Sequence, residues 1–152
     1  MTTPPGACPP AALLMRGVCR SLDQLGYASL VEFPLANGRR ADVLALGKTG
    51  ELIIVEIKSS VADFRADRKW PAYRDFSDRL IFAVPNDFPA LLIPEECGLM
   101  VADAFGAEKV RDGAATPLAA ARRRAVIVQF GRAAAIRLRR LLDPQAPLDD
   151  LF

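Results

Sequence analysis

The chain has 152 residues, 51% hydrophobic and 25% charged, which is typical of one globular domain that can bury a core. Its formal net charge of +2 is too small to indicate nucleic-acid binding by itself, so such a signal must come from local patches. It has no histidine and three cysteines without C-x-x-C spacing, which excludes histidine-based catalysis, the common zinc sites and a disulfide framework. Carboxylates and lysines remain for catalysis, and they favour metal-assisted chemistry.

The first half of the sequence predicts one helix and three strands. Residues 11–25 place apolar side chains at helical spacing, and Gly26 is a natural helix end. Two glycine-containing turns then separate the segments that read as strands. We expect these strands at residues 27–35, 41–46 and 52–58, with the turns at 36–38 and 47–50.

The second half predicts further alternation of helices and strands. Ser60 is suited to cap a helix that starts near Val61 and runs through Trp70, where Pro71 interrupts it. The elements expected after it are a buried strand at 80–84, a short helical piece at 89–93, a hairpin at 98–103 and 107–111, and a long helix at 116–142. This order predicts an α/β sheet with helices packed against it.

The sequence shows no linker that would split the chain. We expect a single domain over residues 11–142 and flexible tails at 1–10 and 143–152. The first residues lack the basic region of a signal peptide, and no apolar run is long enough to cross a membrane. We therefore expect a cytoplasmic protein without a membrane partner.

The third strand ends with the most informative residues of the sequence. Glu56 and Lys58 are two positions apart, so they project from the same face of a strand that is otherwise apolar. If the turn before this strand is a three-residue loop with glycine in the left-handed position, Asp42 lies opposite Glu56. An Asp followed by Glu-x-Lys on the next strand is typical of a magnesium-dependent phosphodiesterase, although a strand-end ion pair that neutralises itself would give the same pattern.

The same count across the first turn brings in a third carboxylate. A three-residue loop at 36–38 pairs Glu32 with Asp42, so that three acids lie side by side across three strands. Such a row is destabilised by repulsion and requires a cation. A two-residue Asn37-Gly38 loop would instead turn Glu32 to the opposite face.

These residues predict a site for Mg²⁺ or Mn²⁺. Asp42 and Glu56 would bind the ion together with the backbone carbonyl of Ile57, because magnesium prefers oxygen ligands and keeps several waters. Lys58 would hold the attacking water or stabilise the charged transition state. Glu32 is the additional catalytic candidate.

Several basic and aromatic residues are candidates for contact with DNA. Arg39 and Arg40 flank the carboxylate row, and they can either grip phosphate or keep a hairpin turn soluble. Lys69 and Tyr73 can touch a phosphate, although Lys69 also fits a solvated charge. The arginines of the last helix spread around it and form no single stripe by sequence, so we expect a solvated helix with some phosphate contact.

Asp63, Asp67 and Trp70 would share one face of the predicted helix that begins near Val61. They can form the edge of a cleft beside Glu56. Alternatively, the two acids favour the N-terminal half of the helix and Trp70 belongs to the core.

Taken together, these residues resemble the PD-(D/E)XK nuclease superfamily, through Asp42 and the Glu56-Ile57-Lys58 triplet in an α-β-β-β-α-β order. Within that superfamily the chain is similar to the MmcB-type DNA-repair proteins of bacteria, over about residues 11–142. The segments that carry this similarity are Gly38-Arg39-Arg40-Ala41-Asp42, Glu56-Ile57-Lys58-Ser59-Ser60, Asp63-Phe64, Asp67-Arg68-Lys69-Trp70, Tyr73, Phe82-Ala83-Val84-Pro85 and Gly98-Leu99-Met100-Val101-Ala102-Asp103.

The resemblance implies a restriction-endonuclease-like mixed β-sheet flanked by helices, and Mg²⁺-dependent hydrolysis of DNA in repair. It implies DNA and other repair proteins as partners, and a cleft this small would grip a duplex better as a homodimer. The chain departs from the superfamily at Ala41, where proline is usual, and in the first helix, which offers only Asp23 where many members have a glutamate. The second departure leaves open a catalytically inactive accessory that binds DNA or a protein partner.

Overall fold

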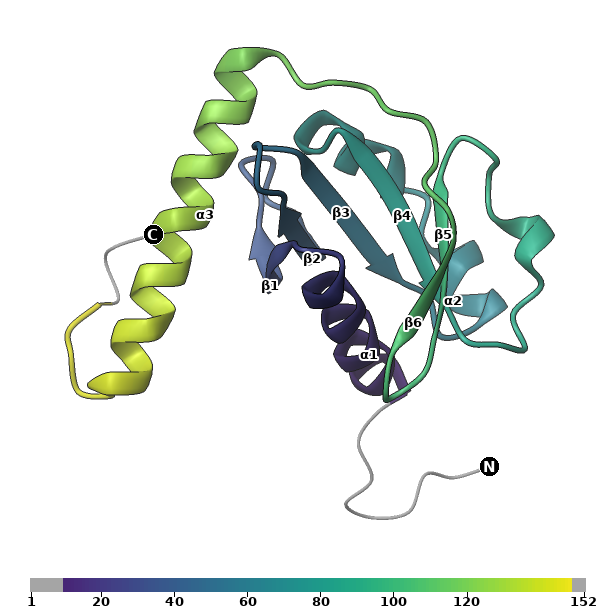
Figure 1. Cartoon of the computed structure of the whole chain (residues 1–152), viewed down its shortest axis with the longest axis horizontal. Helices are drawn as coiled ribbons and strands as arrows, with labels where there is room; N and C mark the ends of the chain where they lie inside the picture. Colours follow the sequence, from purple (N-terminus) through teal and green to yellow (C-terminus); the bar gives the residue numbers. More distant parts are fainter. Residues whose placement is uncertain (1–9, 149–152) are drawn as a thin grey trace. The chain divides into compact units, whose positions relative to one another are not determined.

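Six strands form one mixed sheet in the computed structural model, which describes residues 10–148 (Figure 1). The strands follow one another across the sheet in chain order; the β3–β4 and β4–β5 pairs are parallel and the other pairs antiparallel. Their bounds are β1 Ala28–Pro34, β2 Arg40–Leu46, β3 Leu52–Ile57, β4 Arg79–Val84, β5 Gly98–Ala102 and β6 Ala107–Arg111. The prediction of an α/β fold with a mixed sheet and flanking helices is confirmed.

The chain divides into two compact units, Met1–Leu118 and Ala119–Phe152. The first contains the sheet and the helices α1 Pro10–Gln24, α2 Val61–Ala66, η1 Trp70–Phe76 and η2 Ala90–Leu92, of which the two η helices are 3-10 helices. The second contains α3 Ala120–Leu142, after which residues up to Leu148 form turns. The predicted domain at 11–142 covers parts of both units and stays a prediction. Among the described residues, none of the helices has the length and apolar character needed to cross a bilayer.

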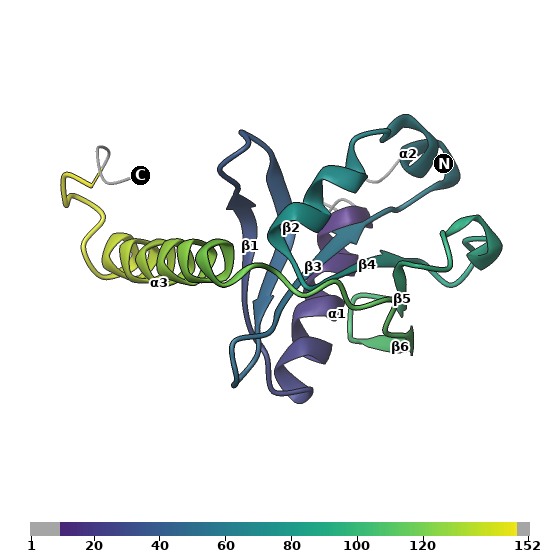
Figure 2. The same cartoon turned by 90° about the horizontal axis from the view of Figure 1, so that it is seen from above.

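One face of the sheet is covered by α1, as Figure 2 shows. Leu14, Val18 and Leu22 recur at helical spacing and form one buried cluster with alternate residues of the central strands. Val55 and Ile57 of β3 belong to this cluster. Because successive side chains of a strand point to opposite faces, Glu56 lies on the other face.

That other face is covered by α2 and η1. Phe82 of β4 is paired with Glu56 in the sheet register and is fully buried. The rings of Phe64 and Trp70 meet it edge to face, at centroid distances of 5.4 and 5.5 Å. The site residues at the end of β3 therefore lie beside a packed aromatic group.

Both hairpins have the predicted register. The Leu35 N–H donates to the Arg39 carbonyl at 2.7 Å, and the Gly47 N–H donates to the Glu51 carbonyl at 2.8 Å, so each hairpin closes around a three-residue loop. Gly38 and Gly50 have φ values of +83° and +96°, the left-handed region that such a loop requires of its last residue. The alternative two-residue loop is therefore wrong.

The predicted helix from Val61 to Trp70 is wrong in its second half. α2 ends at Ala66, because Asp67 takes an extended conformation and its own carboxylate accepts the Lys69 N–H at 2.9 Å. The helical face expected to join Asp63, Asp67 and Trp70 consequently does not exist. Trp70 instead opens η1 and is half-buried.

The ends of the chain differ from the prediction as well. Pro10, expected in a tail, already belongs to α1, and residues 143–148 fold into turns that leave Leu148 buried. The other residues of the predicted tails, 1–9 and 149–152, lie outside the described part.

The last helix starts at Ala120 and not at Thr116, since Asp78 holds the preceding segment in extended form. The Asp78 carbonyl accepts the Thr116 N–H at 2.7 Å, and its carboxylate accepts the Leu118 N–H at 2.9 Å. The other carboxylate oxygen accepts the buried Leu52 N–H at 2.8 Å. Asp78 is therefore a structural clamp between the start of β3 and the segment before α3.

We expect Asp78→Ala to lower the free energy of unfolding by about 2–4 kcal/mol, because two N–H groups of low exposure lose their acceptor. Urea unfolding followed by circular dichroism would measure this loss. The exposed Asp87→Ala, as a control, should stay within about 0.5 kcal/mol of the parent. Equal stability of the two variants would contradict the clamp.

Candidate metal-dependent phosphodiesterase site

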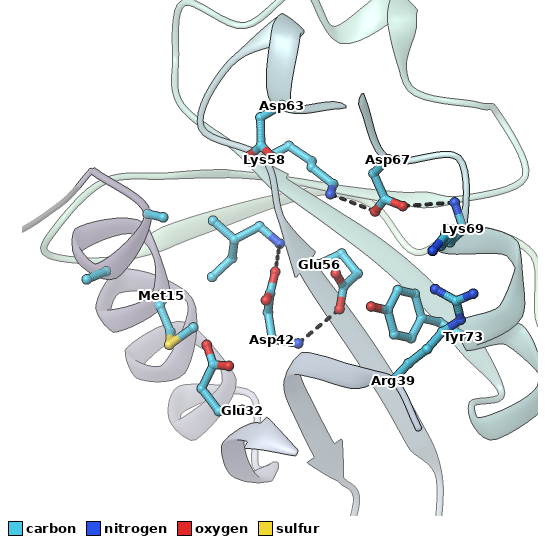
Figure 3. Close-up of a pocket in the computed structure, with 13 residues that line it drawn as sticks. Met15, Glu32, Arg39, Asp42, Glu56, Lys58, Asp63, Asp67, Lys69 and Tyr73 are labelled. Carbon is cyan, nitrogen blue, oxygen red and sulfur yellow. Dashed lines mark hydrogen bonds and ion pairs between the residues drawn. The ribbon is translucent and has the colours of Figure 1, made fainter. Parts of the chain in front are cut away.

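Asp42 and Glu56 are joined by reciprocal bonds between side chain and backbone. The Asp42 N–H donates to Glu56 Oε1 at 2.9 Å, and the Ile57 N–H donates to Asp42 Oδ2 at 2.8 Å (Figure 3). The regular pairing of β2 with β3 ends one step earlier, at Val43 and Val55. The two carboxylates thus complete the hydrogen bonding where the ladder stops, and they lie on the same face of the sheet, as predicted.

Lys58 is turned toward a residue that the sequence did not assign to it. Its Nζ donates to Asp67 Oδ2 at 2.7 Å, and the two side chains are only 7% and 20% exposed. Asp67 reaches this position because the chain leaves the helical path after Ala66. Lys58 is therefore paired with Asp67, and not with Glu56 as in the alternative of a strand-end ion pair that neutralises itself.

A pocket of about 580 Å³ gathers nearly all the candidates at this end of the sheet. The start of α1 closes one side, and η1 and the segment before it form another (Figure 3). The lining residues are Ala11, Ala12, Met15, Glu32, Arg39, Asp42, Glu56, Ile57, Lys58, Asp63, Asp67, Lys69 and Tyr73. The α1 residues of this list were not predicted, since a short apolar stretch of helix carries no chemical signal.

Glu32 reaches the pocket, but its surroundings differ from those of the other two acids. The flanking pairs Val31–Val43 and Phe33–Ala41 place it opposite Asp42, as predicted. Its φ of +50° lies in the left-handed region, which is unusual for a residue other than glycine within a strand, and its Oε2 forms an ion pair with Arg40 Nε at 2.6 Å. Glu32 is thus a carboxylate at the rim with a cation beside it.

The remaining DNA-contact candidates divide into two groups. Arg39, Lys69 and Tyr73 line the pocket. Arg40 does not line it and pairs with Glu32, so the structure separates Arg40 from the other three. The Tyr73 hydroxyl donates to the Arg40 carbonyl at 3.2 Å, which fixes the ring against β2.

The carboxyl pair resists ionisation. Burial, and then the neighbouring charge of Asp42, raise the pKa of Glu56 to about 8. Burial also raises the pKa of Asp42, against the opposing effect of the Ile57 N–H bond. Burial and the charge of Glu56 raise the pKa of Tyr73 to about 12. By contrast, burial raises the pKa of Asp67, but the hydrogen bond and charge of Lys58, together with the N–H groups of Lys69 and Trp70, outweigh it and lower that pKa overall.

The donor set limits what kind of ion could bind. In the described part of the chain, no three Asp, Glu, Cys or His side chains converge as a ready-made metal centre. Two carboxyl groups do meet in this pocket, and burial raises the free energy of the charged form of each. Magnesium commonly takes one or two protein carboxylates and completes its shell with water and phosphate. The residues present therefore fit a hard ion held by two acids and not a closed cage.

Comparison with known proteins gives a family match. Residues 5–145 match the family described as DNA repair protein MmcB-like. A solved structure of an SPO1766 protein of unknown function from Silicibacter pomeroyi is 47% identical, covers 91% of this chain and 95% of its own, and superposes with a TM-score of 0.88. A repair endonuclease from Pyrococcus abyssi is 17% identical over 45% of this chain and 33% of its own, with a TM-score of 0.32, which is too distant to bear on function. None of the curated proteins compared with the chain matches it.

The carboxyl pair predicts a pH dependence of stability without divalent ions. Since the pKa of Glu56 is about 8 in the folded protein, folding favours its protonated form. This contribution is complete below its ordinary pKa of 4.5 and is lost as the pH rises through 8. Urea unfolding between these limits should show stability that falls with pH, by at most about 1.4 kcal/mol per pH unit for one proton. Glu56→Gln should flatten this slope, whereas the control Glu95→Gln, at an exposed position, should not. A parent protein whose stability does not change with pH would contradict the prediction.

The contact between Lys58 and Asp67 predicts that substitutions of these two residues have strongly non-additive effects on the free energy of unfolding. Asp67→Ala leaves a buried ammonium without its partner and should cost about 3 kcal/mol of stability. The double variant Lys58→Met/Asp67→Ala should recover most of this loss, because it removes the stranded charge. Chemical denaturation of the four proteins of the cycle measures the coupling, and additive losses would show that the contact is energetically unimportant.

Proposed function

Because this chain belongs to the MmcB-like DNA repair protein family, we propose that it is a DNA nuclease that depends on Mg²⁺ or Mn²⁺. The observation that supports this most is the pair of carboxylates, buried Glu56 and half-buried Asp42, at the ends of two adjacent strands with an amine nearby. Hydrolysis of a DNA phosphodiester bond needs a divalent ion, a positioned water and stabilisation of added negative charge. The pocket offers groups for each of these needs.

Asp42 and Glu56 would hold the ion, together with the carbonyl of Ile57, and Glu32 could join from the rim through water. When bound, the ion would supply Lewis-acid polarisation of the phosphate and make water more acidic. A cation between the two acids would also remove the cost of charging them in a buried place. Each acid keeps one oxygen on a backbone N–H, which fixes the direction of its other oxygen.

Lys58 would act on water and phosphate. Its ammonium group has three donors, and Asp67 accepts one of them. The others can orient the attacking water or stabilise the negative charge that develops on the phosphate. Asp67 would hold the amine in place, so that it does not fold back onto the carboxyl pair.

Arg39, Lys69 and Tyr73 line the same pocket and would contact the DNA backbone near the bond that is cut. Arg40 is engaged by Glu32, so we propose that it balances charge at the rim and contacts phosphate only when that pair opens. A duplex is longer than this pocket, and a second copy of the chain could grip it further along.

A second candidate is a non-catalytic accessory in DNA repair that binds DNA or another repair protein. It is favoured by the absence, among residues 10–148, of a third carboxylate converging with Asp42 and Glu56. It is also consistent with the close attachment of Lys58 to Asp67. Such a protein would keep the fold and the DNA-contacting residues without binding the ion.

Cleavage assays test the nuclease proposal. Plasmid, nicked, flapped and single-stranded DNA would be incubated with the protein and Mg²⁺ or Mn²⁺. Glu56→Gln keeps an acceptor for the Asp42 N–H, and Lys58→Met keeps the aliphatic stem, so neither should unfold the site. Each is expected to lower the cleavage rate by roughly 100-fold or more, since each removes a charge that acts on the transition state.

Matched exposed variants provide the control. Glu95→Gln and Lys48→Met make the same chemical changes at exposed positions and should cut like the parent. Equal cutting by Glu56→Gln and Lys58→Met would overturn their assignment. Calorimetric titration with Mn²⁺ separates the two candidates: an accessory binds DNA without binding the ion.

A further inference from the structure

Positive charge is concentrated in α3. Seven of its 23 residues are arginine, and none is lysine, aspartate or glutamate. Residues 1–118, by contrast, carry 13 basic and 15 acidic side chains, a formal net charge of −2. The near-neutral total of +2 therefore hides two parts of opposite sign.

Three of these arginines form a stripe along the helix. Arg124, Arg132 and Arg139 are all exposed and are spaced by eight and seven residues. At 3.6 residues per turn they fall within an arc of about 80° and span about 22 Å. The buried residues of the helix, Val126, Phe130, Ala133 and Ile136, lie outside that arc. The stripe is therefore a face of its own, which the distribution of all seven arginines in the sequence had obscured.

The helix surface between these arginines carries only short side chains. Val128, Gly131 and Ala135 fall on or next to the same arc, and all three are exposed. A Cβ at Gly131 would meet nothing within 4 Å, so the packing of the chain does not require glycine there. Glycine in a helix interior is less favourable than alanine. The helix thus leaves room for another molecule to come close to its backbone.

We propose that α3 is a second nucleic-acid contact, in which Arg124, Arg132 and Arg139 bind the phosphate backbone of DNA. The charge is of the complementary sign, and arginine is the side chain whose planar fork matches a phosphate. The stripe contains no acid and few groups able to read a base edge, so it would bind without sequence preference. This inference rests on the proposed function only in taking DNA as the partner, since none of the three arginines belongs to the carboxyl site.

The test measures binding without catalysis. A short labelled DNA duplex would be titrated with the full chain in EDTA, at salt concentrations between about 50 and 200 mM. The variant R124Q/R132Q/R139Q is expected to bind at least about tenfold more weakly at low salt. The slope of log affinity against log salt should become less steep by about 2 to 3, because each lost phosphate contact reduces its magnitude by about 0.9.

Two further variants serve as controls. R20Q/K48Q/K109Q removes the same charge from exposed positions that do not line the pocket, and it should bind within about threefold of the parent. R124K/R132K/R139K keeps the charge and loses the fork, so it should keep the salt slope and bind less tightly than the parent. Its binding also shows that loss in the glutamine variant is not a failure to fold.

The results that would overturn this inference differ from those that would overturn the nuclease proposal. Parent-like binding by the glutamine variant, or equal losses in the two glutamine triples, would overturn the role of α3. So would a parent that binds vesicles of anionic phospholipid and no DNA, since the stripe would then face a membrane surface. If the nuclease proposal alone is wrong, the parent cuts nothing while its binding still depends on the three arginines.

Discussion

Two carboxyl groups held close together at the ends of neighbouring strands are the constraint on which this site depends. Asp42 and Glu56 come together because a three-residue loop closes the hairpin of β2 and β3, and a different loop length would move one acid to the other face. Burial raises the free energy of their charged forms, and each is held in place by a backbone N–H. Under the proposed function, a bound cation would relieve the repulsion between these charged forms.

The charges around this pair are arranged in separate couples. Lys58 is attached to Asp67 and Arg40 to Glu32, so both basic groups stand near the acids without neutralising them. A direct salt bridge to either acid would compete with an incoming ion for the same oxygens. The couples therefore keep the inner carboxylates available while limiting the net charge of the pocket.

Strand positions could be predicted from the sequence to within a residue or two, because alternation and left-handed glycines such as Gly38 and Gly50 determine register. The meeting of Asp42 with Glu56 followed from that register alone. The partner of Lys58 could not be predicted, because it depends on where α2 ends, and that end is set by the carboxylate of Asp67 competing with the helix for a backbone N–H. The start of α3 was misplaced for a similar reason, since the residues before it are fixed by contacts with the distant Asp78.

The reciprocal bonds of Asp42 and Glu56 have an evolutionary consequence. Each acid supplies the acceptor for an amide that the sheet itself leaves unpaired, so architecture and chemistry select for the same side chains. If the proposed nuclease function holds, a descendant without cutting activity would still retain an oxygen at both positions, as the acid or as its amide. Isosteric replacement by asparagine or glutamine would therefore mark lost catalysis in such a lineage, while replacement by alanine would be selected against on folding grounds alone.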